Sequence, residues 1–378
     1  MIRVLHLLTD TNVGGAGRFL LSLVRHTDRD AFEPLVALPK DAALLSEFET
    51  LGVRVIPLDG CRDRSFTLAD TRLLLRVIRR EKPDVVSANA CLSGRIAAYL
   101  CRVPCRVFTR HSAFPAKGAL TRFPVRPLAG LAQRILSTDV IAVAEAAADN
   151  LVSLGIPRDR ITVIHNVAEP PRAVAPEETA ALRASLGIPD GAFVAGMLTR
   201  MEPYKGCTDF LDAAGIVLRD RPDTYFLCVG TGSEEAALRE KAAALPAGHV
   251  LFPGFTSDPA LWLSLFSVAV NASYGTETSS LAIHEAAALG VPTVASTYGG
   301  NPELIRDGEN GLLFPPRDAD ALARALLRAA NDEKLLRELA EGARRHHAAE
   351  GTADEWAART CDVYRRRLAA RRHTKHTK

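Results

Sequence analysis

Long apolar runs are missing from this sequence. No stretch approaches the roughly 20 residues that a membrane-spanning helix needs. The start, from Met1 to Leu8, is a short apolar segment that ends at Thr9 and Asp10. It has neither a basic leader nor a small-residue cleavage site, so we expect neither a transmembrane helix nor a secretory signal.

Cysteine is scarce, and its spacing fits no metal or disulfide pattern. The chain has 7 cysteines, an odd number, scattered along its length. Cys101 and Cys105 have no second pair and no nearby histidine at the spacing of a zinc site. We interpret all seven as reduced thiols, which is typical of a cytosolic protein.

Acidic residues are absent from two stretches. Between Val85 and Thr138 there is no Asp or Glu, although eight Lys and Arg residues fall in that window. From Arg365 to Lys378 there are seven more and again no acid, so without this tail the formal net charge falls from +3 to −4. Such stretches favour an anionic partner: phosphate groups, a membrane surface or nucleic acid. The tail lacks aromatic residues that stack on bases, which argues against nucleic acid.

The length and the hydrophobic pattern predict two α/β domains. A chain of 378 residues is long for one core, and 47% hydrophobic residues supply enough apolar surface for two. Short apolar runs alternate with amphipathic stretches, which predicts parallel sheets covered by helices. Prolines 170, 171 and 176 indicate a linker over 169–178. We expect domains at 1–168 and 179–355, with a C-terminal helix of about 356–378 that packs back on the first.

Each domain has its own series of expected strands and helices. The expected strands are 3–8, 35–38, 54–57, 85–88, 106–109, 140–142 and 162–164, then 193–198, 225–229, 250–252, 268–271, 293–295 and 312–314. The expected helices are 17–26, 42–51, 68–81 and 145–154, then 208–219, 234–243, 260–266, 280–289, 319–331, 333–347 and 353–372.

A glycine-containing loop follows the first expected strand. Gly14 and Gly15 would let backbone N–H groups approach an anion where the next helix begins. The glycine spacing of a dinucleotide fingerprint is absent, which argues against a nicotinamide dehydrogenase. A tight strand–helix turn without a ligand is the alternative interpretation.

The second domain carries two cations and a second glycine loop. Arg200 and Lys205 follow the strand that ends at Leu198, at the sheet edge where open α/β sheets bind ligands. A planar guanidinium and a mobile ammonium suit a diphosphate, and two solvated loop cations are the alternative. Gly230 and Gly232 form a turn in which Ser233 is expected to cap the next helix, a scaffold beside a nucleotide.

Two glutamates, Glu277 and Glu285, flank a helix N-terminus. Glu285 lies two turns inside an apolar helix, where a carboxylate needs partners such as the hydroxyls of a ribose. Free first-turn amides would suit a diphosphate, and they belong to Thr278, Ser279, Ser280 and Leu281. The alternative is that Glu277 caps the helix and Glu285 pairs with a basic neighbour.

Taken together and in order, these motifs resemble the retaining glycosyltransferases of family four. The matching segments span nearly the whole chain: the Gly14–Gly15 loop, 109–111, 142–145, 164–166, Arg200, 205–206, 230–232, 252–255, the Glu277/Glu285 pair, 290–295, 299–305 and 307–311. The resemblance implies the GT-B fold of two Rossmann-like domains and a UDP- or GDP-sugar as the donor substrate, with no other cofactor. It implies sugar transfer to a glycan, lipid-linked or phosphorylated acceptor in cell-envelope polysaccharide or glycolipid synthesis.

The resemblance also implies a role for each site residue. Arg200 and Lys205 would bind the diphosphate, Glu285 the ribose, and Glu277 the hydroxyls of a hexose or N-acetylhexosamine. Gly15 would approach the phosphates and His111 the reacting face of the sugar. The chain departs from the family where Thr278, Ser279 and Ser280 replace the common glycine after the first glutamate, and where His165-Asn166-Val167 replaces Pro-Asn-Gly.

The first domain of this architecture holds the acceptor, and it carries the acid-free window. Arg110, Arg122 and Arg126 are candidate contacts to an anionic acceptor or surface. Apolar and basic residues alternate over 119–137, which suits an anionic membrane, although Pro124 and Pro127 interrupt an ideal amphipathic helix. A helix packed on its own core is the alternative. We expect a cytoplasmic enzyme, peripheral on the inner face of the plasma membrane.

We expect no metal. Asp318-Ala319-Asp320 matches the D-x-D pattern of metal-dependent glycosyltransferases, but Asp318 follows two prolines and opens a helix, so N-capping explains it. Two other functions stay open: a GT-B sugar-nucleotide epimerase, which needs further acid/base residues, and a catalytically silent sugar-nucleotide-binding subunit. The sequence indicates no oligomeric state.

Overall fold

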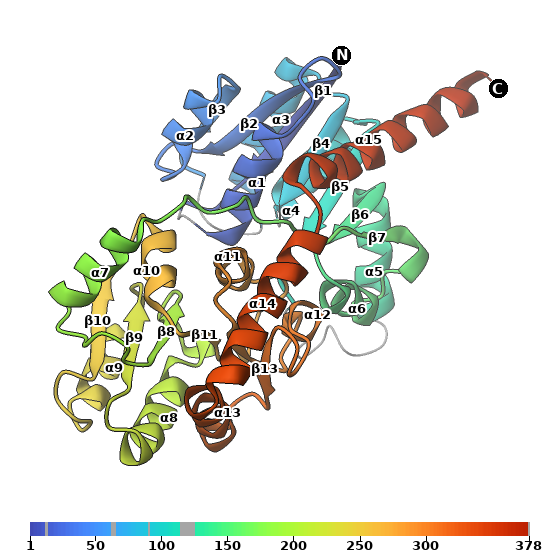
Figure 1. The fold of residues 1–378 in the computed structure, drawn as a ribbon. Coiled ribbons are helices and arrows are strands. Elements are labelled where there is room, and N and C mark those ends of the chain that lie inside the picture. Colours follow the sequence, from blue (N-terminus) through green and yellow to red (C-terminus); the bar gives the residue numbers. More distant parts are fainter. Residues whose placement is uncertain (12–13, 62–65, 90, 114–124, 377–378) are drawn as a thin grey trace. The chain divides into compact units, whose positions relative to one another are not determined.

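The computed structural model describes residues 1–378 except 12–13, 62–65, 90, 114–124 and 377–378, and it does not describe the side chains of 125–129 and 372–376. The chain divides into two compact units. Unit 1 is residues 1–167 with 352–378, and unit 2 is residues 168–351. Each unit has a parallel sheet between helices (Figure 1).

The unit 1 sheet has seven strands in the order β3-β2-β1-β4-β5-β6-β7. They are β1 (Ile2–Leu8), β2 (Phe32–Pro39), β3 (Arg54–Leu58), β4 (Val85–Asn89), β5 (Cys105–Arg110), β6 (Asp139–Ala142) and β7 (Ile161–Val163). The order reverses between β1 and β4, whose register pairs Leu8 with Asn89. Ligands of open α/β sheets bind beyond the carboxyl ends of the strands at such a reversal.

The helices of unit 1 include the last helix of the chain. They are α1 (Gly15–Arg25), α2 (Leu45–Thr50), α3 (Leu68–Glu81), α4 (Leu92–Leu100), α5 (Val125–Leu136), α6 (Glu145–Ser153) and α15 (Ala353–His376). α15 buries Trp356, Ala357, Cys361 and Tyr364. The Tyr364 hydroxyl donates to Ser87 on β4 at 3.4 Å, and its ring packs edge-on against Phe32. These contacts place α15 on the sheet of unit 1.

The unit 2 sheet has six strands in the order β10-β9-β8-β11-β12-β13. They are β8 (Val194–Leu198), β9 (Tyr225–Val229), β10 (Val250–Gly254), β11 (Val268–Asn271), β12 (Thr293–Ser296) and β13 (Gly311–Phe314). The helices are α7 (Pro176–Ser185), α8 (Cys207–Asp220), α9 (Glu235–Ala242), α10 (Pro259–Leu265), α11 (Leu281–Leu289), α12 (Asn301–Leu304), α13 (Ala319–Asn331) and α14 (Glu333–Ala349). Here the order reverses between β8 and β11.

The apolar residues of β8 alternate between the two faces of this sheet. Ala195 and Met197 join the core formed with α8 and α13, whereas Val194 joins the core formed with α10 and α11. Successive strand residues point to opposite faces, so a strand that is buried on both sides reads as continuously hydrophobic. This burial fixes the positions of the two loops that leave β8 and β11.

The strands lie where the sequence predicts them, within a few residues. Three helices were not expected, α4, α7 and α12, and α5 lies within 119–137, where a helix was one of two alternatives. The expected linker over 169–178 is wrong at its end, because Pro176 begins α7. Proline suits the first helical position, where its missing N–H would have had no partner in the helix.

In the described part of the chain, no helix is long and apolar enough to cross a membrane. None of the seven cysteines, which all lie among the described residues, forms a disulfide, and burial raises the pKa of several, including that of Cys91 to about 11.

Candidate functional site

Lys205 and Glu277 come together at the reversal point of the unit 2 sheet. Lys205 ends a short 3-10 turn (Pro203–Lys205) after β8, and Glu277 lies in the loop after β11. The Lys205 Nζ atom lies 2.8 Å from Oε2 of Glu277. Their side chains are only 19% and 8% exposed, so this is a largely buried ion pair.

The Glu277 carboxylate is held in its ionised form. The same Oε2 accepts a hydrogen bond from the Ser273 hydroxyl at 2.8 Å. Burial alone would raise the pKa of Glu277, but the charge and hydrogen bond of Lys205, with hydrogen bonds from Ser273 and Asn271, lower it below its usual value. Glu277 does not cap α11, whose N-cap residue is Ser280. The carboxylate is thus fixed at the sheet edge.

The backbone around this pair is closely packed. Gly206 has φ +72°, and a Cβ there would lie 2.2 Å from the carbonyl oxygen of Ala272, in the loop after β11. Thr276, next to Glu277, also has a positive φ of 64°. A non-glycine residue rarely adopts this conformation, so the loop that presents Glu277 is locally strained.

Arg200 lies apart from the ion pair. Its side chain is exposed in the loop after β8, and its Nη2 donates to the Tyr204 hydroxyl at 3.2 Å. The structure therefore brings Lys205 and Glu277 into contact but leaves the Arg200 guanidinium near the surface. Tyr204 and Ser273 were not singled out from the sequence; their positions one and four residues from the paired side chains are the only signal.

The glycine turn after β9 packs against the Arg200 loop. A Cβ on Gly230 would meet the carbonyl oxygen of Thr199, and a Cβ on Gly232 would meet the backbone of Met201. The expectation that Ser233 caps the next helix is wrong, because its hydroxyl donates to Glu202 at 2.8 Å and α9 begins after Glu234. Glycine at these two positions allows the two loops to pack against each other. This packing accounts for both glycines without a bound ligand.

The residues that open α11 lie beside the ion pair. Thr278 and Ser280 are buried, while Ser279 and Leu281 are half-buried. The backbone of Gly299 and Gly300 lies against the carbonyls of Glu277 and Thr278, where a side chain would clash. Glu285 is half-buried on α11 between the buried His284 and Ala286. In an α-helix, the N–H groups of the first turn have no carbonyl acceptor within the helix itself.

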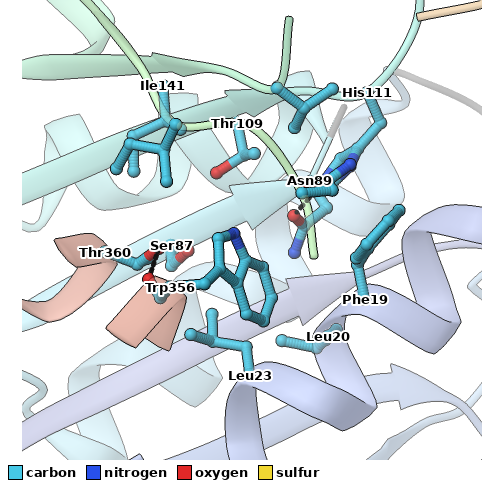
Figure 2. Close-up of a pocket in the computed structure, with 13 residues that line it drawn as sticks. Phe19, Leu20, Leu23, Ser87, Asn89, Thr109, His111, Ile141, Trp356 and Thr360 are labelled. Carbon is cyan, nitrogen blue, oxygen red and sulfur yellow. Dashed lines mark hydrogen bonds between the residues drawn. The ribbon is translucent and has the colours of Figure 1, made fainter. Parts of the chain in front are cut away.

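In unit 1, His111 lines a small pocket between α1, α15 and the sheet (Figure 2). Its Nε2 lies 2.8 Å from Oδ1 of Asn89, whose amide nitrogen donates to the Leu7 carbonyl, so Nε2–H is the donor to Asn89. The imidazole stacks on Phe19, which in turn contacts Trp356. Burial lowers the pKa of His111 to about 4, so the ring is neutral at neutral pH.

The other candidate residues of unit 1 are two glycines at the start of α1 and three arginines. Gly14 is the N-cap of α1 and Gly15 its first residue, and a Cβ on Gly14 would lie 2.9 Å from an Asp10 carboxylate oxygen. Arg110 is half-buried, and its Nη2 donates to Asn150 at 3.0 Å. Arg122 and the side chain of Arg126 lie outside the described residues, and α5 forms despite Pro127.

Among the described residues, no group of three or more His, Cys, Asp or Glu side chains could hold a metal ion. The N-capping interpretation of the D-x-D pattern is confirmed, because Oδ1 of Asp318 accepts from the Ala321 amide at 2.8 Å.

Comparisons with known proteins add two findings on family. Residues 13–170 match the family described as "Glycosyltransferase Family 4", and residues 192–332 match "Glycosyl transferases group 1". D-inositol 3-phosphate glycosyltransferase of Streptomyces bingchenggensis is 33% identical over 303 residues, covering 74% of this chain and 66% of that protein. This chain thus spans about two thirds of the length of that relative.

A second relative and a solved structure are also similar. The Escherichia coli UDP-Gal:alpha-D-GlcNAc-diphosphoundecaprenol alpha-1,3-galactosyltransferase is 28% identical, covering 69% of this chain and 70% of that protein. The crystal structure of Anabaena HepE in complex with UDP and glucose superposes with a TM-score of 0.84 at 24% identity, covering 96% of this chain and 99% of that chain. This likeness shows the GT-B fold.

Proposed function

Because this chain belongs to glycosyltransferase family 4, we propose that it transfers a hexose or N-acetylhexosamine from a nucleotide sugar to a glycan, lipid-linked or phosphorylated acceptor. We propose retention of the anomeric configuration and a role in cell-envelope polysaccharide or glycolipid synthesis. The fold follows from the family. The glycosyltransferase activity, the donor, the acceptor and the stereochemistry are our proposal.

The observation that carries the proposal is the Lys205–Glu277 pair at the reversal point of the unit 2 sheet. A lysine ammonium has three N–H donors, and Glu277 takes one of them. The others, with the exposed Arg200 guanidinium, would stabilise the negative charge that grows on the diphosphate as the glycosidic bond to it breaks. Glu277, ionised and fixed, would accept hydrogen bonds from sugar hydroxyls.

The nucleoside would lie along α11. Glu285 is half-buried on this helix, and its carboxylate would accept two hydrogen bonds from a ribose diol. The first-turn amides of Thr278 to Leu281 would bind the diphosphate. We propose a UDP- or GDP-sugar, with UDP favoured because HepE, of the same fold, was crystallised with UDP. Arg200, Lys205, Glu277 and Glu285 would thus act mainly by positioning and electrostatics.

Unit 1 would supply the acceptor side. Gly14 and Gly15 open α1 at the carboxyl edge of the sheet, where a backbone can approach phosphate closely. His111, neutral and oriented by Asn89, could exchange a hydrogen bond with a reacting hydroxyl but could not supply a positive charge. Arg110 is proposed as an acceptor contact that would first have to release Asn150.

A cytoplasmic location on the inner face of the plasma membrane is proposed from the acid-free stretch 85–138 and the basic tail. Sedimentation with vesicles that contain anionic phospholipid, at low salt, tests this idea. Binding to anionic but not neutral vesicles supports it, and recovery of all the protein in the supernatant contradicts it.

Donor hydrolysis tests the function itself. The protein is incubated with UDP-, GDP-, ADP- and dTDP-sugars, and release of free sugar is followed by NMR, which also reports the first anomer formed. Slow hydrolysis of one donor, with retention, is expected. Thermal stabilisation without turnover, even with glycan acceptors present, would instead favour a silent binding subunit, and a change at sugar C2 would favour an epimerase.

A further inference from the structure

Ser279, His284 and Glu350 form a continuous chain of hydrogen bonds in unit 2. The Ser279 hydroxyl lies 3.0 Å from Nε2 of His284, and Nδ1 of His284 lies 2.9 Å from Oε2 of Glu350. Ser279 directly precedes Ser280, the N-cap of α11, and Glu350 follows the last residue of α14. His284 is 1% exposed, so its imidazole is sealed between the two helices.

No sequence motif indicates this hydrogen-bond chain. His284 neighbours Glu285 but points to a different face of α11, and Glu350 is 66 residues away. The packing of α14 against α11 brings them together. The Ser279 hydroxyl lies in the segment proposed above to bind a diphosphate, so the half-buried Glu350 carboxylate connects through one imidazole to the candidate site.

Several titratable and charged groups lie around this hydrogen-bond chain. On α14, His346 Nε2 lies 3.8 Å from Glu350 Oε1, and His347 Nδ1 lies 3.5 Å from Oε2. The positive charge of Arg306 acts on His346, and Arg344 lies against Gly290 at the far end of α11. Burial alone would raise the pKa of Glu350, but its hydrogen bond to His284 and the three histidines lower it. The carboxylate is therefore ionised and accepts from Nδ1–H.

Two hydrogen-bond states are compatible with an ionised Glu350. In the first, His284 is neutral and its proton is on Nδ1, so Nε2 can only accept a hydrogen bond. The Ser279 hydroxyl then donates its single proton to Nε2. Its lone pairs then face outward and would repel phosphate oxygens. In the second, Nε2 also carries a proton and donates to Ser279, whose own O–H is released to donate to a phosphate. The two states differ by one proton, which comes from the solvent.

We propose that the Ser279–His284–Glu350 chain couples the binding of a nucleotide diphosphate to the uptake of a proton, with Ser279 as the contact to phosphate and His284 and Glu350 as positioning residues. The inference rests on the proposed function, since it needs a diphosphate at the start of α11. The opposite charge of Glu350 stabilises the doubly protonated imidazole when the anion binds. A hydroxyl group that merely held the loop would show no such linkage.

Calorimetry of UDP-glucose binding tests the coupling. The diphosphate of UDP-glucose has no group that titrates near neutral pH, so proton exchange reports on the protein. Binding heats at pH 7.5 are compared in Hepes and in Tris, whose heats of ionisation differ. We expect the wild type to take up a measurable fraction of one proton per UDP-glucose. In His284→Gln we expect the proton uptake that this hydrogen-bond chain provides to be lost. In Glu350→Gln we expect proton uptake to be reduced.

Variants of Ser279 and a matched control sharpen the test. Ser279→Ala should abolish the proton uptake. It should also weaken UDP-glucose binding about tenfold, as expected for the loss of one charge-assisted hydrogen bond. Ser279→Thr, which keeps the hydroxyl, should restore both. His347→Gln, on the same end of α14 and beside Glu350 but without a contact to Ser279, should behave as the wild type.

The outcomes separate this inference from the proposed function. If wild type binds UDP-glucose without buffer dependence, or if His284→Gln takes up as many protons as wild type, the coupling is overturned and the glycosyltransferase proposal stands. If UDP-glucose does not bind, the titration is repeated with GDP-glucose and ADP-glucose. Failure of all three to bind overturns both proposals.

Discussion

Lys205 and Glu277, 72 residues apart in the chain, form a largely buried ion pair at 2.8 Å. The two loops that carry them leave β8 and β11, the neighbouring strands at which the strand order reverses. The sheet topology therefore creates the contact, and neither loop could form it alone.

Replacing Lys205 should therefore harm stability as well as turnover. Lys205→Ala leaves a buried carboxylate without its counter-ion, which costs about 3–5 kcal/mol when a buried pair is broken. We expect a lower urea midpoint and at least about a tenfold fall in turnover. The double variant Lys205→Ala/Glu277→Gln should recover part of the stability but none of the turnover. Full additivity of the two substitutions would contradict the pairing.

Gly206 offers a test of the loop packing that supports this pair. Gly206→Ala combines the strain of a positive φ with a clash against the Ala272 carbonyl. The matched control is Gly248→Ala, where φ is +83° but nothing lies within 4 Å. The control should cost about 1–2 kcal/mol, the usual penalty of the left-handed conformation. Gly206→Ala should cost more in urea unfolding and should also reduce donor hydrolysis; equal costs would contradict the clash.

The sequence predicted the strands well because both sheets are parallel and buried. β9 (Tyr225–Val229) and β13 (Gly311–Phe314) read as short apolar runs between turn residues, which is the pattern of a strand covered on both faces. Helix α4 was missed because its residues, Leu92–Leu100, are mostly small or apolar and give little periodic contrast. α7 was missed because Pro176 was interpreted as a linker residue.

The candidate site was predictable only one side chain at a time. Lys205, Glu277 and Glu285 could be selected because charged residues next to apolar strands or inside an apolar helix need partners. Ser273, the partner of Glu277, could not be selected, since it is an ordinary serine. Nor could Glu350, the partner of His284, since it is an ordinary helix-end glutamate. Contacts between residues far apart in sequence depend on how the helices pack on the sheet and on one another. The packing of α14 against α11, which joins His284 to Glu350, is an example.

Glu285 should matter for the donor and little for the fold. The side chain is half-buried on α11, so removing it exposes no large cavity. We expect Glu285→Ala to lower donor turnover at least about tenfold, since a charge-assisted hydrogen bond is worth roughly 1.5–3 kcal/mol. The urea midpoint should change little, and Glu240→Ala, at an exposed position on α9 of the same unit, serves as a surface control. Unchanged rates in both Glu285→Ala and Lys205→Ala would contradict the assigned site.

His111 should make the protein sensitive to acid. Burial holds its pKa at about 4, below the ordinary histidine value of about 6.5. The unfolded chain therefore binds more protons between these values, so stability is lost as the pH falls from about 6.5 to 4. Urea midpoints measured across this range should fall less steeply for His111→Gln than for the wild type. Identical slopes would contradict a buried neutral imidazole, and a pH–rate step between 6 and 7 that disappears in this variant would place the His111 pKa much higher.

Chelation should leave the activity intact. The D-x-D pattern at 318–320 is accounted for by Asp318, which caps α13 through the Ala321 amide. Arg200 and Lys205 supply positive charge where a divalent cation would otherwise neutralise the diphosphate. Donor hydrolysis should therefore be unchanged in EDTA and unaffected by added manganese or magnesium. Asp318→Ala should cost about 0.5–2 kcal/mol of stability through the lost cap, with no effect on the metal response. Loss of activity in EDTA, with recovery in manganese that Asp318→Ala abolishes, would instead make the D-x-D pattern a metal site.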